Sequence, residues 1–280
     1  MLGIALALGS SLVWGSADFL GGIYTRRLSL AGVVVISQMA GLLALLATAA
    51  ATGGPAALNG EAFAIGLAAG GFGAVGIAAF YAALAAGTMS IVSPVSACGA
   101  VIPMVLALVG GERPGAIALA GAVIALAGAV MASIHEYSGG RPGGRASILL
   151  AVLAAGGIGG YLFCIGHAAR GGHTLEALLG GRTGSLFLLI LASLLTARSM
   201  RVPRHAILAV AAIGLMDTSA NALFALATQH GYLSIVSVLG SVYPIVTVLL
   251  AQIVLRERLT AVQAAGVVTA LVGVAIVSAA

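Results

Sequence analysis

The sequence predicts an all-helical membrane protein of ten transmembrane helices, built as two inverted repeats of five helices each. Three observations lead to this prediction: the composition, the length of the apolar runs and an internal repeat. Apolar residues make up 61% of the 280 positions, charged residues only 7%, and the mean hydropathy is +1.18. Because about a quarter of the residues of a soluble domain are charged, we expect lipid to surround this chain.

The apolar runs have the length of membrane-spanning helices. A bilayer core requires about 20 mostly apolar residues per helix, whereas a barrel strand alternates apolar and polar residues over about ten positions. These runs are apolar on all sides, so helices are expected rather than strands. They cover residues 2–22, 29–51, 62–86, 89–109, 115–134, 146–168, 174–197, 206–228, 232–255 and 260–279.

An internal repeat relates the two parts of the chain. Residues 87–93 (GTMSIVS) match residues 231–237 (GYLSIVS) at a shift of 144 positions. At a shift of 145, the pair Glu112 and Arg113 matches a second Glu-Arg pair at 257–258. These Glu-Arg turns predict caps or ion pairs at helix ends.

The repeat predicts a first unit over residues 1–138, a polar linker over 139–145 and a second unit over 146–280. Five crossings is an odd number, so the second unit would enter the membrane inverted relative to the first. Inverted repeats of this kind are common in secondary transporters.

Glycines at small-xxx-small spacing predict close helix packing, since they allow backbones to approach where lipid offers no hydrophobic drive; the same spacing can also mark hinges or a roomy cavity. The pairs are Gly66 and Gly70, Gly156 and Gly160, and Gly180 and Gly184.

Several functions are excluded by residues that the sequence lacks. All 12 basic residues are arginines, so there is no lysine for a nucleotide-binding P-loop. The arginines are scattered over loops, which argues against a nucleic-acid partner. Neither an HExxH nor a GxSxG motif occurs, and Cys98 and Cys164 lack CxxC spacing. We therefore expect no catalytic site, no metal and no cofactor.

Arginine distribution predicts the orientation. The loops on the side shared by both termini carry Arg113 and Arg170, and the loops on the other side carry nine arginines: 26, 27, 141, 145, 198, 201, 204, 256 and 258. Because positive charge accumulates in cytoplasmic loops, both termini are expected outside the cytoplasm.

The two aspartates are the sharpest local signal, because Asp18 and Asp217 both fall inside expected spans, where charge is costly. Asn221 lies one turn after Asp217 on the same face. Arg182, in the preceding span, is a candidate partner for Asp217. Two interpretations remain open: an ion pair that fixes helix register, or a site for a substrate headgroup or a proton.

Other candidate residues are less decisive. Asp18 follows Trp14 by one turn. In one interpretation Trp14 forms an aromatic wall for a substrate side chain and Asp18 binds the amino group of the substrate. In the other, Trp14 is a packing residue and Asp18 lies at the membrane interface; the two interpretations are equally compatible with the sequence. Gln38 is an isolated polar residue in the second span. It suits either a cavity or a hydrogen bond between helices. Tyr81, Tyr161 and Tyr243 suit either a cavity or the membrane interface.

Trp14-Gly15 in the first span, Tyr243-Pro244 in the ninth and the Glu-Arg turns together resemble the EamA-type transporters of the drug/metabolite transporter superfamily. The resemblance implies ten helices, a central cavity between two halves, and export of amino acids or other metabolites. The sequence departs from it at several points, two of which concern the site and the orientation. Family members often carry an arginine where Gln38 stands, and both termini are commonly assigned to the cytoplasm.

The expected function is secondary transport of a small zwitterion or weakly polar molecule across a bacterial inner membrane, by alternating access, with proton or exchange coupling. The alternatives are a passive channel, a non-transporting scaffold and, less favoured, a lipid enzyme. A homodimer is one option for its assembly. The expected substrate-binding residues are Trp14, Asp18, Gln38, Tyr81, Arg182, Asp217, Asn221 and Tyr243.

Overall fold

The computed structural model describes residues 1–25, 27–53, 59–86, 95–96, 98–134, 145–196, 199–254, 256 and 259–280, without the side chains of residues 81 and 84–86. Over these ranges all regular structure is helical, as the composition predicts. The elements are α1 (Leu2–Thr25), α2 (Leu30–Ala51), α3 (Gly60–Ala86), the 3₁₀ turn η2 (Cys98–Ala100), α5 (Val101–Val109), α6 (Ala116–Ala132), α7 (Arg145–Ala169), α8 (Thr174–Leu195), α9 (Arg204–Gln229), α10 (Leu233–Gly240), α11 (Tyr243–Val254) and α12 (Ala261–Ala279).

Within the described ranges, eight helical stretches are long and apolar enough to cross a membrane. The expected helices at 89–109 and 115–134 correspond to shorter apolar helices, Cys98–Val109 and Ala116–Ala132. The repeated string at 87–93, most of the linker and the second Glu-Arg pair lie outside the described residues. Ten complete crossings therefore stay a prediction.

The ninth expected helix, predicted over 232–255, is present as one membrane-length stretch, Leu233–Val254, but a turn interrupts it. Helix α10 ends at Gly240 and α11 begins at Tyr243, with a turn at Ser241 and Val242 between them. Pro244 has no backbone N–H and cannot continue the hydrogen-bond ladder back to the carbonyl of Gly240. The run is apolar throughout, so hydropathy alone does not reveal this break.

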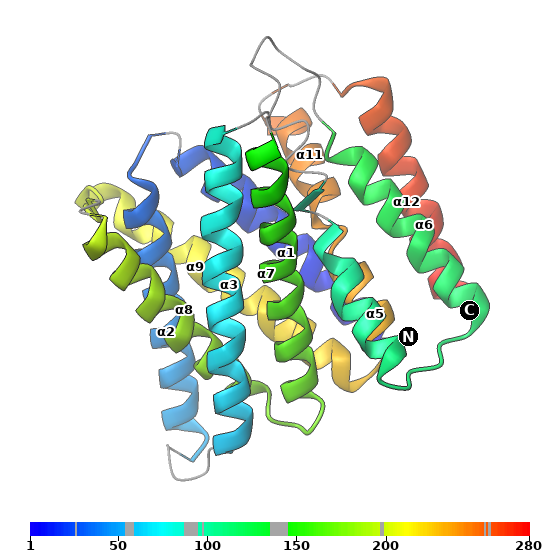
Figure 1. The fold of residues 1–280 in the computed structure, drawn as a ribbon, viewed down its shortest axis with the longest axis horizontal. Helices are drawn as coiled ribbons and strands as arrows, with labels where there is room; N and C mark the ends of the chain where they lie inside the picture. The colour runs from blue at the N-terminus through cyan, green and yellow to red at the C-terminus, as the bar shows by residue number, and fades with distance from the viewer. Residues whose placement is uncertain are drawn as a thin grey trace.

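Helices from the two parts of the chain pack reciprocally. Helix α3 packs against α7 and α8, α9 packs against α1 and α2, and α6 pairs with α12 at one edge of the molecule. Figure 1 shows that both termini lie at the same end of the helices. We call this the terminal end. The connections α5–α6, α7–α8 and α9–α10 lie there as well.

Glycines permit the close crossing of α3 and α8. A Cβ at Gly66 would lie under 3.0 Å from the carbonyl oxygen of Ala177, and one at Gly180 would be as close to that of Phe63. Gly70 and Gly184 make equivalent approaches, so packing is confirmed for both pairs. The prediction is wrong for Gly156, where a Cβ would meet nothing within 4 Å.

Large apolar side chains cover the outside of the molecule, as expected for a protein surrounded by lipid. Leu12, Leu43, Phe187, Leu208 and Val268 are each more than half exposed. The interior is built mainly from alanine, glycine and serine. This small-residue interior lets helices lie close together and leaves the few polar side chains in direct contact.

Candidate functional site

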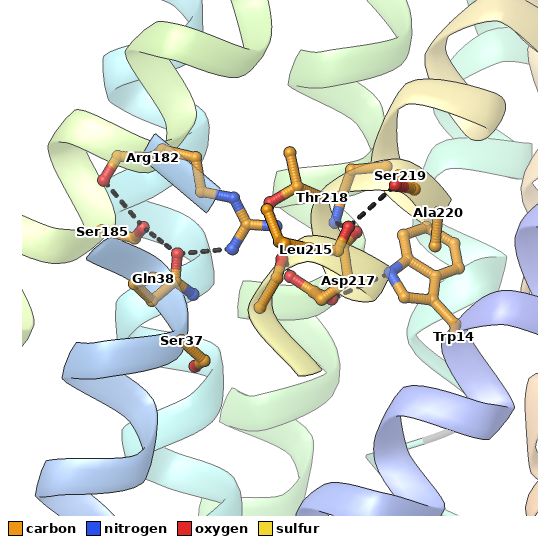
Figure 2. A network of polar contacts seen from close by, with 12 residues as sticks. Trp14, Ser37, Gln38, Arg182, Ser185, Leu215, Asp217, Thr218, Ser219 and Ala220 are labelled. Atoms are coloured by element: carbon orange, nitrogen blue, oxygen red, sulfur yellow. Dashed lines mark hydrogen bonds and ion pairs between the residues drawn. The ribbon is translucent and has the colours of Figure 1, made fainter. Parts of the chain in front are cut away.

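Asp217 is the centre of a polar network between the helices (Figure 2). It lies in the middle of α9, and its Oδ2 forms an ion pair with Nη2 of Arg182 on α8. The predicted pairing of these two residues is therefore confirmed. The Arg182 side chain is only 6% exposed, whereas that of Asp217 is 34% exposed. The carboxylate thus remains accessible although its arginine partner is buried.

The other side of the Arg182 guanidinium is held by α2. Nη1 of Arg182 donates to Oε1 of Gln38 at 2.5 Å, and the Ser185 hydroxyl donates to the same oxygen at 3.3 Å. Gln38 is buried. Gln38 and Arg182 are 144 positions apart, which is the shift that relates the two repeated strings. The same shift therefore pairs these two positions in the alignment of the repeat, and in the structure they are also in contact.

Trp14 brings α1 into the same network. Its indole Nε1 donates to Oδ1 of Asp217 at 3.1 Å. The indole ring lies 5.7 Å from the ring of Phe224 and 6.4 Å from that of Tyr243, measured between centroids. A Cβ on Gly240, at the end of α10, would be 3.5 Å from the indole. Trp14 therefore connects Asp217 to the break between α10 and α11.

Two glycines let α2 approach α9 closely enough for this network to form. A Cβ on Gly214 would lie under 3.0 Å from the carbonyl oxygen of Ser37, and one on Gly41 would be equally close to the hydroxyl of Thr218. Both glycines are within one turn of a network residue. The sequence analysis missed them because neither belongs to a small-xxx-small pair with another glycine.

Asn221 and Tyr161 extend the network toward α7. The Asn221 amide donates to the backbone carbonyl of Asp217 at 2.6 Å, as their spacing predicts. The Tyr161 hydroxyl donates to Oδ1 of Asn221 at 2.5 Å. The sequence left Tyr161 open between a cavity and the membrane interface, because nothing in its neighbourhood identified a partner 60 residues away.

Asp18 lies close to the network without joining it. Its side chain is exposed, and it forms no hydrogen bond or ion pair within the part of the chain that the structure describes. It is within electrostatic range of both Asp217 and Tyr243. Its exposure is compatible both with an amino-group partner and with an interfacial position, so its role stays a prediction. The predicted Tyr81 cannot be compared, because its side chain lies outside the described residues.

The network lies deep in the bundle. Trp14, Gln38, Arg182 and Asp217 each lie two turns or more from both ends of their helices, and two of them precede the linker while two follow it. In the described ranges no group of three or more histidine, cysteine, aspartate or glutamate residues could hold a metal ion. The polar groups present suit hydrogen bonding and charge pairing with an organic molecule.

Fold and site together define a multi-pass helical membrane protein with a charged centre between its helices. The chain belongs to the EamA-like transporter family, whose model matches residues 1–134 and 145–279. One solved crystal structure superposes with a TM-score of 0.81 at 19% sequence identity, covering 99% of this chain and 96% of the other. At that identity the likeness establishes a shared fold only. Among curated proteins there is no match.

Proposed function

We propose that this protein is a secondary transporter that exports small organic metabolites, such as amino acids, across a bacterial inner membrane by alternating access. Two inverted five-helix repeats would exchange conformations around the polar network. The reciprocal packing of α3 on α7 and α8, and of α9 on α1 and α2, supports this arrangement.

The observation that supports the proposal most strongly is the accessibility of Asp217 deep inside the bundle. A charge at mid-membrane is costly, about 2.5–3.5 kcal/mol on insertion scales, and such residues commonly mark transport pathways. An ion pair that only fixed helix register would need no access to either partner. Here Arg182 is sealed, while a third of the Asp217 side chain stays exposed. A broken helix beside the site, as at α10 and α11, is also typical of transporter binding sites.

The charges favour a substrate that carries an amino group. Arg182 already neutralises Asp217, so the exposed Asp18 is the acid left to attract a cation. Trp14 and Tyr243 provide an aromatic wall next to it, which suits an apolar or aromatic side chain. A small zwitterion or amine fits this set of groups better than a multiply charged phosphate.

Transport by proteoliposomes tests the proposal. Wild-type protein should show saturable flux of one class from a mixed amino-acid panel, measured with and without an imposed pH gradient. Asp217→Asn should lower that flux by about 30-fold or more, because loss of one partner of a buried, hydrogen-bonded charge pair costs several kcal/mol. A flux that responds to the pH gradient in wild type alone would indicate proton coupling through Asp217.

Ser219→Ala is the matched control on the same helix, because the Ser219 hydroxyl is exposed and bonds only to the backbone of its own helix. Its flux should equal that of wild type. Normal flux in Asp217→Asn would refute the assignment of the site. Flux that does not saturate and ignores a counter-gradient would identify a passive channel instead, and no flux for any compound would favour a scaffold.

Orientation is a separate expectation. The arginine distribution favours extracytoplasmic termini, so alkaline phosphatase fused after Ala280 should be active in cells and green fluorescent protein fused there should be dark. The opposite result would place both termini in the cytoplasm and show that the loop arginines do not decide the topology of this chain.

A further inference from the structure

The terminal end carries a second charged cluster. It joins Glu112, which precedes the linker, to Arg170 and the start of α10, which follow it. Glu112, in the α5–α6 connection, forms an ion pair with Arg170, which directly follows α7. Its two carboxylate oxygens also accept the backbone N–H groups of Leu233 and Ser234, each at 2.9 Å. The Glu112 side chain is only 8% exposed. The Glu112 carboxylate therefore links the α5–α6, α7–α8 and α9–α10 connections.

Leu233 and Ser234 are the first residues of α10, so Glu112 supplies a cap from a distant part of the chain. The first N–H groups of a helix have no partner within the helix, and the positive end of the helix dipole favours a carboxylate there. The sequence predicted that the Glu-Arg turn serves a helix end. This is confirmed for Glu112, but the capped helix and the paired arginine are not its neighbours in sequence.

Helix α10 connects this cluster to the polar network. All eight of its residues are buried. Its first residue is bound to Glu112, and its last, Gly240, packs against the Trp14 indole that donates to Asp217. The turn at Ser241 and Val242 interrupts the helix between α10 and α11. Helix α10 is thus the element that directly joins Glu112 at one end to Trp14 at the other.

The cluster borders a depression that is open to the outside of the molecule. A surface depression of about 580 Å³ is lined by Glu112, Arg113, Arg170 and Tyr232, among others. Arg170 is 35% exposed. The ion pair can therefore separate with its charges becoming hydrated, unlike a pair sealed inside the bundle, which would have to break in a medium of low dielectric constant.

We propose that Glu112 is a latch that keeps the terminal end closed, and that its release from Arg170 and from the start of α10 opens a path from that end to the polar network. The proposal rests on alternating access as the proposed function. It assigns the open direction in this structure to the opposite end, toward which the exposed Asp18 lies along α1.

A buried reporter on α10 tests the latch. Ser237 is 0% exposed and lies between Glu112 and Trp14 along the chain segment that would move. With Cys98 and Cys164 replaced by alanine, Ser237→Cys should react slowly with a water-soluble methanethiosulfonate while the latch is closed. Glu112→Gln should increase the labelling rate by about tenfold, a typical size for a conformational coupling.

Two further variants should give an intermediate labelling rate and an unchanged labelling rate, respectively. Arg170→Gln removes the ion pair but leaves both backbone hydrogen bonds of Glu112, so its labelling rate should fall between those of wild type and Glu112→Gln. Arg113→Gln is the matched control, because Arg113 lines the same depression and bonds only to backbone carbonyls. Its rate should equal that of wild type. If Glu112→Gln does not accumulate as folded protein, Arg170→Gln against Arg113→Gln decides the question.

Equal labelling of wild type, Glu112→Gln and Arg170→Gln would overturn the latch, whatever the transport assays show. A purely structural cap would lower the melting temperature of Glu112→Gln without speeding the labelling measured well below it, and that result too would overturn the proposal. Because labelling requires no substrate, a graded series in a protein that transports none of the tested compounds would count against the proposed function, while still showing that Glu112 controls access to α10.

Discussion

Arg182→Gln is expected to lower the free energy of unfolding by about 3–5 kcal/mol, the usual consequence of removing one partner of a buried ion pair. The loss arises because the Asp217 carboxylate is left in the bundle without the cationic partner that it has among the described residues. Gln38 also loses the Nη1–H donor that its carbonyl oxygen accepts. Thermal or denaturant unfolding in detergent measures the effect. Arg201→Gln, at an exposed position outside the bundle, should change the same measurement little.

The double variant Arg182→Gln with Asp217→Asn separates stability from transport. Two neutral amides leave no uncompensated charge, so most of the lost stability should return. Transport should not return, because the accessible carboxylate is still missing. A double variant as unstable as Arg182→Gln alone would mean that the ion pair is not the source of the loss. Recovered transport would instead assign the pair a purely structural role.

Gly214→Ala is expected to be the most damaging single methyl group that can be added to the centre of the molecule. The new Cβ would lie under 3.0 Å from backbone atoms of Ser37, which cannot rotate away as a side chain would. The helices α2 and α9 must then separate, at a cost of about 3 kcal/mol, the upper end of the usual range for overpacking. Separation also moves Gln38 away from Arg182, so both the melting temperature and transport should fall together.

Gly156→Ala provides the comparison, since the chemical change is identical and a Cβ there meets nothing within 4 Å. Its backbone is equally helical, so the intrinsic preference of alanine over glycine in a helix should make it neutral or slightly stabilising. If the two variants melt at the same temperature, the close crossing at Gly214 does not hold the network together.

The helices could be predicted because a bilayer leaves the backbone few alternatives: each polar group of a lipid-exposed segment must be bonded within that segment. The first expected helix, 2–22, accordingly falls within Leu2–Thr25. The break at Ser241 could not be predicted in the same way, because both α10 and α11 are apolar and hydropathy does not register the missing N–H of Pro244.

The network was predictable only where physical chemistry demands a partner. Asp217 and Arg182 could be paired in advance because a lone charge in lipid is costly and successive helices are usually neighbours. The hydrogen bond from Trp14 to Asp217 spans 203 positions, and no periodicity links the two residues. The role of Gly214 depends on the atoms of another helix, which composition does not describe.

Gln38 and Arg182 hold corresponding positions in the two parts of the chain and are also in contact with each other. Two related residues that touch must lie beside the axis that relates them. In the proposed exchange each takes the place of the other, so their depths in the bilayer are exchanged, and the change in depth is small because both lie beside the axis. A charge whose depth changes little does little work against the membrane potential. The voltage across the membrane would therefore act mainly on Asp18, on Asp217 and on the cargo, while Arg182 would contribute little to the electrical work of the cycle.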